Sequence, residues 1–243
     1  MELTMEQLKI GDISIEYELY RSKKAKKVCL TIKNKRVRVA VPQELPLEYA
    51  KDFVEKNKEW ILEHYRKQSS KTQNLPKKYL PGDKLFYRGR NYPLKYVETS
   101  NSKHYAQFIG SRILVYVPPG LEPEKRSDLG KTLIEQWYRD QAEKILSEQV
   151  HYYAKKLDIS FNKLKIKDQK TRWGSCSTKG NINLNWRIIM APNQVIAYVI
   201  IHELTHLIYM NHSTEFWKRV EQYMPDYRKW KKWLDDNGNQ LFI

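Results

Sequence analysis

Residues 202–212 read His202-Glu203-Leu204-Thr205-His206-Leu207-Ile208-Tyr209-Met210-Asn211-His212. Side chains at positions i and i+4 lie on one face of an α-helix, so His202 and His206 can hold one metal ion from successive turns. Glu203 follows His202 directly, where its carboxylate can reach a water molecule bound to that ion without ligating it. This is the H-E-x-x-H pattern that is typical of zinc-dependent hydrolases.

The helix around this pattern favours a metal site over a chance match. Residues 194–210 are predicted to form one helix that is apolar almost all round, which is typical of a buried core helix. Two neutral histidines and an ionisable glutamate are costly in such a setting unless they are paired or bound to a metal. That cost counts against the alternative, in which the two histidines only form hydrogen bonds inside the core.

A catalytic zinc site needs a third protein ligand and one open position. His212 is the nearest candidate, because the five residues after His206 allow the helix to end and the chain to turn back. Glu215 and Glu221 are rival third ligands, since some zinc hydrolases take a glutamate from the following helix. Cys176 as a fourth ligand would close the open position. We favour His212 and expect one Zn²⁺ ion, with Mn²⁺ or another divalent metal as the alternative.

The chain of 243 residues has 44 Lys and Arg against 28 Asp and Glu, a formal net charge of +16. Such a field attracts anions, among them nucleic acid, nucleotides and acidic surfaces. Basic clusters at 21–27 and 33–36 contribute to it, although lysines beside an exposed strand also protect against aggregation. The expected partner is a peptide or an anionic substrate such as a nucleotide. Nucleic acid is a further candidate, which the basic N-terminal module would bind, although charge alone does not establish it.

The sequence also predicts a compartment. The N-terminus has neither the basic nor the apolar region of a secretory signal, and the longest strongly apolar run, 195–201, is too short to span a bilayer. Cys29 and Cys176 are far apart and form no metal or redox spacing. We therefore expect a cytoplasmic protein with no membrane partner.

Three segments are expected along the chain: a basic strands-then-helix module at 1–70, a linker and second strand set at 71–120, and the catalytic domain at 121–243. Alternating apolar residues predict strands at 13–20, 27–33, 36–41, 84–87, 92–98, 105–109 and 112–117. Helical spacing predicts helices at 47–67 and about 122–157. Val41-Pro42 recurs as Val117-Pro118 and Trp60 as Trp137, at offsets of 76 and 77 residues. These landmarks are compatible either with an internal duplication of a strands-then-helix unit or with a chance match.

Beyond the long helix, the sequence predicts a small sheet and three helices. The expected strands are 163–167, 172–177 and 181–189, followed by the metal-binding helix. Two short helices come next, the first capped by Ser213 and the second beginning after Pro225. This order predicts the α+β class, with the metal-binding helix against a small sheet.

Several of these segments resemble the YgjP-like family of predicted metal-dependent hydrolases, which is related to the SprT-type zinc peptidases. The resemblance rests on Arg172-Trp173-Gly174-Ser175-Cys176-Ser177, on 180–187, on the H-E-x-x-H segment, on Asn211-His212-Ser213 and on Phe216-Trp217. The segment 87–94 is also similar, although the family tends to have Leu-Gly where this chain has Arg88-Gly89. The resemblance covers essentially the whole chain. It implies a zincin-like fold and a metal site of three histidines, His202, His206 and His212.

The expected mechanism is hydrolysis by a metal-activated water, with Glu203 as the general base that returns the proton to the leaving group. Four further side chains are candidates to bind substrate or to stabilise the negative charge of the transition state: Arg172, Arg187, Tyr209 and Tyr223. Asn183 and Asn185 are expected either to line the cleft or to cap strand edges.

Three functions are compatible with these residues. The first is a zinc metallopeptidase, in which a strand near the metal-binding helix pairs with an extended peptide. The second is a metal-dependent nucleoside triphosphate pyrophosphohydrolase, which the positive charge favours. The third is a DNA-associated protease similar to the SprT-type relatives, in which the basic N-terminal module binds DNA.

Overall fold

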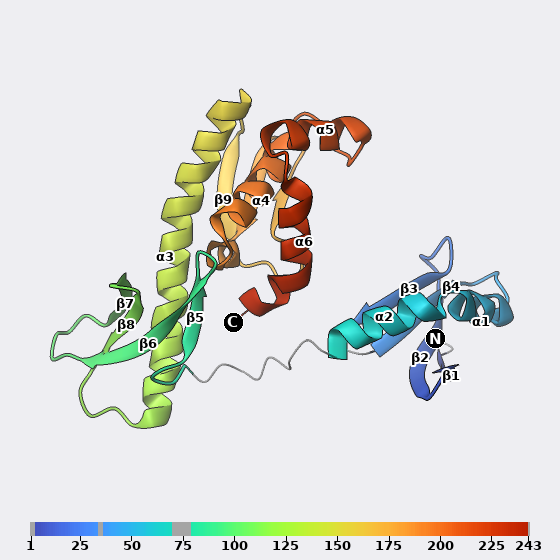
Figure 1. The fold of residues 1–243 in the computed structure, drawn as a ribbon, viewed down its shortest axis with the longest axis horizontal. Coiled ribbons are helices and arrows are strands. Elements are labelled where there is room, and N and C mark those ends of the chain that lie inside the picture. The colour runs from blue at the N-terminus through green and yellow to red at the C-terminus, as the bar shows by residue number, and fades with distance from the viewer. Residues whose placement is uncertain (1–2, 34–35, 70–78, 243) are drawn as a thin grey trace. The chain divides into compact units, whose positions relative to one another are not determined.

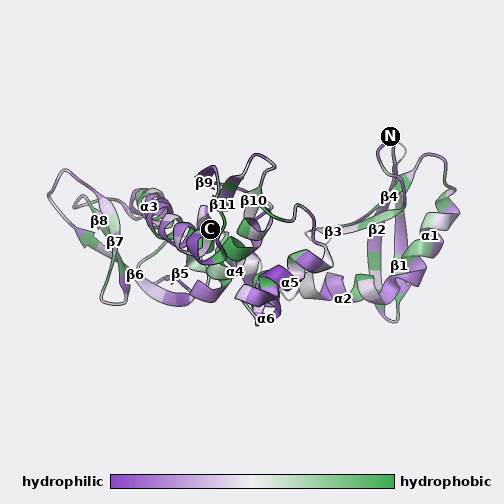
Figure 2. Ribbon diagram, turned by 90° about the horizontal axis from the view of Figure 1, so that it is seen from above, coloured by the Kyte–Doolittle hydropathy of each residue, from purple (hydrophilic) through white to green (hydrophobic). Residues whose placement is uncertain are grey.

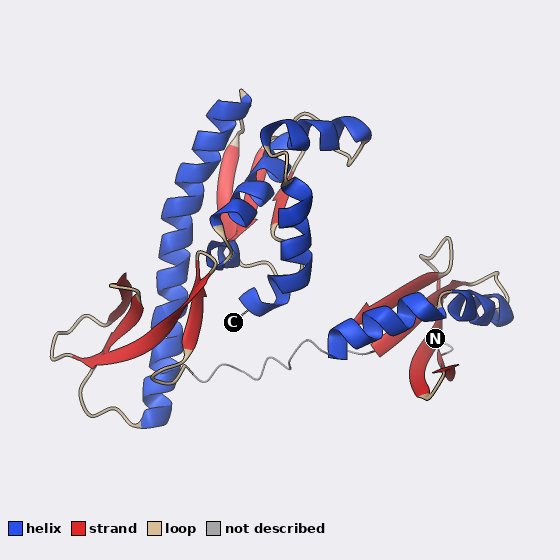
Figure 3. Cartoon of the chain, viewed as in Figure 1, coloured by secondary structure: helices blue, strands red, loops and turns tan. Residues whose placement is uncertain are grey.

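The computed structural model describes residues 3–33, 36–69 and 79–242. The chain divides into two compact units, residues 1–75 and 76–243. Mixed strands and helices occur in both units (Figures 1 and 3), so the predicted α+β class is confirmed.

The first unit is a four-stranded sheet followed by two helices. Its elements are β1 (Leu3–Ile10), β2 (Ile13–Ser22), β3 (Cys29–Lys33), β4 (Arg36–Pro42), α1 (Leu47–Lys56) and α2 (Lys58–Ser69), and the sheet order is β1-β2-β4-β3. In β4 the valines at 37, 39 and 41 are fully buried because alternate residues of a strand face the same side. They pack with Ala50 and Val54 of α1 in one apolar core.

The second unit consists of a four-stranded sheet, a three-stranded sheet and helices around one core. Its elements are β5 (Lys84–Tyr87), β6 (Arg90–Glu98), β7 (Tyr105–Ile109), β8 (Arg112–Val117), α3 (Pro123–Leu157), β9 (Lys163–Lys167), β10 (Gly174–Cys176), β11 (Asn181–Asn185), the 3-10 helix η1 (Trp186–Met190), α4 (Asn193–Thr205), α5 (Thr214–Tyr223), α6 (Tyr227–Asn237) and the 3-10 helix η2 (Gly238–Leu241). The 35-residue α3 packs against β7 and β8 of the first sheet and against η1 and α4 (Figure 1).

The four-stranded sheets of the two units have the same topology. The orders β1-β2-β4-β3 and β5-β6-β8-β7 both combine an antiparallel, a parallel and an antiparallel pairing. The registers repeat as well: Cys29 pairs with Ala40, and Tyr105 pairs with Tyr116, each 76 residues later. Helix α1 begins at Leu47 and α3 at Pro123, again 76 residues apart. The repeated strands-then-helix arrangement suggested by the sequence is therefore confirmed.

Several element boundaries differ from the sequence-based predictions. Strand β1 was not expected, because Leu3 and Met5 are exposed and of its inward positions only Leu8 is buried. The expected helix 47–67 is two helices, α1 and α2. It is interrupted at Asn57, whose side-chain amide donates to the Phe53 carbonyl at 2.7 Å. Such local bonds compete with a continuous helix.

Helix α4, which carries His202, Glu203 and the residues before His206, is buried along nearly all its length and is largely hydrophobic (Figure 2). It packs against α3, α5, α6 and β10. The turn between β5 and β6 also fixes its start, because the Gly89 N–H donates to the Met190 carbonyl at 2.8 Å. A Cβ on Gly89 would lie 2.8 Å from Pro192. Among the described residues, no helix is both long and apolar enough to cross a membrane.

Candidate metal centre and catalytic cleft

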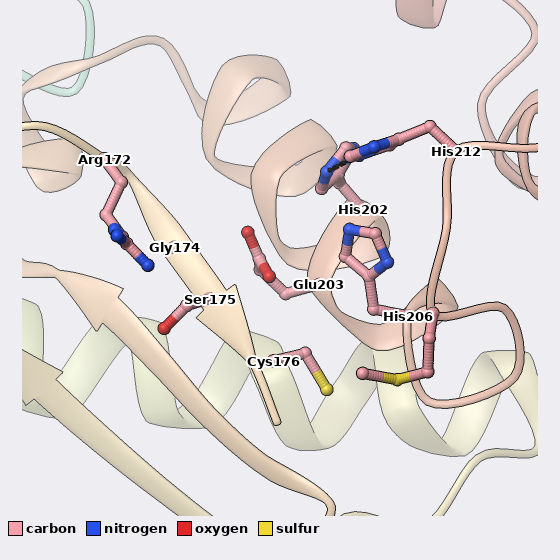
Figure 4. A pocket seen from close by; sticks show the side chains of 9 residues that line it. Arg172, Gly174, Ser175, Cys176, His202, Glu203, His206 and His212 are labelled. Carbon is pink, nitrogen blue, oxygen red and sulfur yellow. Dashed lines mark hydrogen bonds between the residues drawn. The ribbon is translucent and has the colours of Figure 1, made fainter. Parts of the chain in front are cut away.

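The three histidines of the sequence motif come together at the end of α4. His202 lies in the last turn of the helix, and His206 is the residue that caps it. The chain then turns back and brings in His212, so that one potential ligand atom from each ring lies within 4.8 Å of the others (Figure 4). The Nε2 atoms of His202 and His212 are 3.1 Å apart.

This arrangement fits a zinc ion. Two nitrogens bound to one tetrahedral zinc lie about 3.3 Å apart, given Zn–N bonds of about 2.0–2.1 Å. His206 Nδ1 lies 3.0 Å from the Tyr209 carbonyl oxygen, which can only accept a hydrogen bond. Nδ1 of His206 therefore carries the proton, and Nε2 keeps a lone pair that could bind a metal ion, which is the usual arrangement of metal-bound histidines.

The histidines are held in the uncharged form that binds metals. Burial lowers the pKa of His202 to about 3, with smaller contributions from His206, His212 and the Lys231 cation. Burial also lowers the pKa of His206. At neutral pH both rings can therefore offer a lone pair without first losing a proton.

The predicted helix 194–210 ends earlier than expected, at Thr205. The N–H groups of Leu207 and Ile208 donate to carbonyls three residues back, at 204 and 205, which tightens the chain into turns. Because the helix ends at the second histidine, the next residues can leave its axis and return His212 to the site. No glycine or proline marks this end in the sequence.

Glu203 is buried beside the histidines, with 6% of its surface exposed. Burial raises the pKa of its carboxyl to about 8, although the Arg172 cation acts in the opposite direction. A carboxyl with a pKa near neutrality can both take up and release a proton under working conditions. The strand β10 runs along the other side of Glu203 from the histidines (Figure 4).

Gly174 makes the close approach of β10 to Glu203 possible. A Cβ at position 174 would lie 2.5 Å from Glu203 Oε1 and 2.6 Å from its Cγ, far inside van der Waals contact. The sequence contained Gly174 within the quoted motif but gave no sign of this role, because the contact joins two elements that are distant in sequence.

Gly174→Ala is expected to displace the Glu203 carboxylate and to lower the hydrolytic rate at least tenfold while metal content is unchanged. The added methyl group has no space, and overpacking of this kind costs about 1–3 kcal/mol. The rate, the bound metal and the thermal midpoint test this expectation. The double variant with Glu203→Asp, whose side chain is shorter, should regain stability, since residues in contact do not add independently. A Gly174→Ala protein with normal rate and stability would show that β10 is not held against Glu203.

The cleft beside the metal centre has a volume of about 350 Å³. Its lining residues come from β10, the segment before it, α4 and the loop after it: Arg172, Gly174, Ser175, Cys176, His202, Glu203, His206, Met210 and His212. Burial raises the pKa of the Cys176 thiol to about 11. Cys176 is not part of the ligand group found among the described residues, which leaves the site open on the cleft side.

Of the four transition-state candidates, the cleft includes Arg172 but not the others. Arg187 forms an ion pair with Asp168 and lies over the Trp186 ring. The Tyr223 ring is covered by the Arg219 guanidinium at 4.8 Å. Tyr209 contributes its backbone carbonyl to His206, whereas its phenol is not part of the lining.

The rival third ligands also lie apart from the histidines. Glu215 is exposed in the first turn of α5, and Glu221 pairs with Arg228 at 3.0 Å. Neither belongs to the ligand group that the described residues form.

Asn185 supports the cleft from behind. It is fully buried, and its side-chain amide donates to the carbonyls of Gln169 and Arg172 at 2.7 and 3.2 Å. Its side-chain oxygen accepts from the Arg187 N–H and so begins η1. The expected strand 181–189 therefore ends at Asn185, and Asn185 positions the backbone that presents Arg172. Asn183 donates to Ser175 Oγ at 3.1 Å across the strand pair.

Three kinds of known protein were compared with the chain: curated proteins, solved structures and protein families. No curated protein matches the chain. Among solved structures, it is similar to the metallopeptidase zymogen of Pyrococcus abyssi abylysin, with 23% identity over 37% of this chain and 91% of that one and a TM-score of 0.35. It is also similar to the metallopeptidase zymogen of Methanocaldococcus jannaschii jannalysin, with 23% identity, coverages of 37% and 94%, and a TM-score of 0.33.

A model of the family described as "YgjP-like, metallopeptidase domain" matches residues 26–237. The match includes every residue that lines the cleft. The family implies a divalent metal and metal-dependent, peptidase-like hydrolysis, in agreement with the histidine cluster. The chain belongs to the YgjP-like family of metallopeptidase domains.

Proposed function

We propose that this protein is a zinc-dependent peptidase in which His202, His206 and His212 hold the ion and Glu203 moves the proton. The observation that supports this most strongly is the meeting of three histidine ligand atoms, within 4.8 Å of one another, beside the buried Glu203 carboxylate in one open cleft. The nitrogen spacing and the uncharged rings suit zinc.

His202, His206 and His212 would hold the zinc ion, which would supply Lewis-acid chemistry: a lower pKa for a bound water and polarisation of the scissile carbonyl. Glu203 takes the proton of the nucleophile and returns it to the leaving amine. Arg172 lines the same cleft, and its cation favours the ionised carboxylate. The guanidinium also offers hydrogen-bond donors to negative charge that develops during the reaction.

The edge position of β10 supports a peptide substrate. In the three-stranded sheet of order β10-β11-β9, β10 lies at the edge, and β11 is its one strand partner in the described part of the chain. All three of its residues, Gly174, Ser175 and Cys176, also line the cleft. An extended peptide that adds to this edge by backbone hydrogen bonds would lie directly beside the reacting groups.

The alternative proposals are a nucleoside triphosphate pyrophosphohydrolase and a DNA-associated protease. A triphosphate needs several cations, whereas Arg172 is the one Lys or Arg among the described residues that line the cleft. Residues 1–75 contain 16 Lys and Arg against 11 Asp and Glu, and residues 76–243 contain 28 against 17. The positive charge is therefore spread over the chain rather than concentrated in the N-terminal unit. These features favour the peptidase.

The proposal is tested by assaying the protein, loaded with Zn²⁺ or Mn²⁺, on casein and on nucleoside triphosphates. We expect casein to be cleaved and the triphosphates to remain intact, with both results compared against Glu203→Gln. Hydrolysis of the triphosphates without cleavage of casein would replace the peptidase with the pyrophosphohydrolase. Turnover of neither class with either metal would contradict a hydrolase that acts on these substrates.

A further inference from the structure

A second hollow, which we call the α6 pocket, lies between α5 and α6 and has a volume of about 310 Å³. Its lining residues are Trp217 of α5 and five residues of α6: Tyr227, Arg228, Lys231, Lys232 and Asp235. The α6 pocket shares no lining residue with the catalytic cleft. None of the mechanistic steps above uses it.

The aromatic wall of the α6 pocket is continuous with the metal centre. Trp217 stacks on the His212 ring with a centroid distance of 5.6 Å and on the Tyr227 ring at 5.2 Å. The His202 ring is also close to Trp217, at 5.8 Å. The faces of the Trp217 ring are occupied by this stacking. The edges of the aromatic rings therefore face the pocket, and ring edges carry the positive end of the aromatic quadrupole.

The remaining lining residues give the pocket a net positive charge. Its described lining includes three basic residues, Arg228, Lys231 and Lys232, and one acidic residue, Asp235. Asp235 pairs with Lys231 at 3.0 Å, and Arg228 pairs with Glu221 at 3.0 Å. Across the described ranges, Lys232 takes part in no ion pair and no hydrogen bond. One positive charge in the pocket is thus left without a protein partner.

We propose that the α6 pocket is a subsite for an acidic side chain of the peptide substrate. This inference rests on the proposed peptidase function. Two stacking steps of 5.6 and 5.2 Å separate the His212 ring from the Tyr227 ring. An extended peptide advances roughly 3.3 Å per residue, so the acidic residue lies about three positions from the bond that is cleaved.

Carboxylate is the ligand chemistry that best fits these features. The pocket offers a free ammonium group and aromatic edges to an anion, and both kinds of group stabilise negative charge. A nucleotide would need an open ring face for its base, whereas Trp217 already stacks on two rings. The α6 pocket therefore selects substrates by charge at a position away from the scissile bond.

The test measures binding rather than turnover, so that it stands apart from the peptidase assay. The protein carries Glu203→Gln to prevent cleavage and is loaded with zinc. The probes are dansylated decapeptides of alanine and serine with a single glutamate scanned along the chain, each with a twin that has glutamine instead. Fluorescence titration at low salt gives the dissociation constants, because charge contacts at exposed sites are weakened by salt.

We expect at least one glutamate peptide to bind about tenfold more tightly than its glutamine twin, and Lys232→Glu to abolish that difference. Lys229→Glu is the matched control, since Lys229 is on the same helix over the Trp230 ring and is not part of the pocket. It makes the same change in net charge and should preserve the difference. Circular dichroism checks that both variants are folded.

Equal binding of every glutamate peptide and its twin would overturn the subsite. An equal loss in Lys229→Glu and Lys232→Glu would also overturn it, because net charge alone would then be responsible. Adenosine triphosphate is titrated in the same way. If it binds more tightly than any peptide, and if this binding is lost in Lys232→Glu, the pocket is a site for a phosphate ligand instead. Failure of the peptidase function itself appears separately, as zinc- or manganese-loaded wild-type protein that does not cleave casein.

Discussion

Glu203→Gln is expected to lower the hydrolytic rate constant about 10³-fold while the protein keeps its fold and its metal. A glutamine amide has nearly the same size and shape as the carboxylate, so it can occupy the space between β10 and the histidines. It cannot take a proton from the nucleophile at neutral pH. The loss should therefore lie in kcat, with little change in KM. Single-turnover kinetics on a peptide that the wild type cleaves would measure it.

Metal content is the necessary control for this variant. Glu203 is outside the group of potential ligands formed by the three histidines, so a Glu203→Gln protein should bind as much zinc as the wild type. A variant with full metal content and full activity would rule out Glu203 as the general base. A variant that has lost its metal would instead give Glu203 a structural role at the site.

Replacing a single histidine of the cluster is expected to remove stoichiometric metal and all measurable activity. His212→Ala is the most informative case, because His212 is exposed and alanine there leaves the buried core intact. A catalytic zinc site with two protein ligands lacks the third that such sites use. Mass spectrometry of the purified protein for bound metal, combined with the peptidase assay, measures both effects.

Thermal unfolding adds a readout that does not depend on activity. An ion that binds only the folded state stabilises it by about 4 kcal/mol at a free concentration 1,000 times its dissociation constant. Zinc should thus raise the thermal midpoint of the wild type but not of His212→Ala. His151→Ala is the matched control, because His151 is exposed and contacts the Ser147 carbonyl of its own helix, at 2.8 Å. If His212→Ala still binds stoichiometric zinc, His212 is not the third ligand, and Glu215 and Glu221 are again the candidates.

The part of the site that was predictable from sequence is the part carried by local spacing. His202, Glu203 and His206 are placed by the helical repeat, and the short connection to His212 limits how far that residue can be from them. Ser213 was expected to cap α5, and its hydroxyl does accept from the Phe216 N–H. Each of these features depends on a few consecutive residues.

The other features of the site depend on contacts between segments that are distant in sequence. The alternation of apolar residues and the spacing of motif residues do not predict such contacts. Arg172 and Arg187 are equally plausible in the sequence, yet one lines the cleft and the other pairs with Asp168. The role of Gly174 follows from the separation of two backbones that meet only after folding. The sequence allowed Asn185 either to face the cleft or to cap a strand edge. Its side chain is instead buried, because it donates to the carbonyls of Gln169 and Arg172 in the loop that packs over it.

In the fold as well, features that depend on local sequence were predictable, and features that depend on contacts between distant segments were not. The bounds of strands with a series of buried valines, such as β4, were predicted to within one residue. Strand β1 has too few buried apolar positions to be predicted from alternation. The duplication was visible in two landmarks, but only the pairing registers establish that the strands between them correspond.

The repeated sheets also have a consequence for how the enzyme is made. Each is built from a short stretch of chain, within residues 3–42 and 84–117, so its pairings can form soon after synthesis of that stretch. Domains generally fold as units while translation proceeds. The three histidines are translated well after both sheets, so a ribosome-bound chain can form both repeated sheets before the residues of the metal centre have been synthesised.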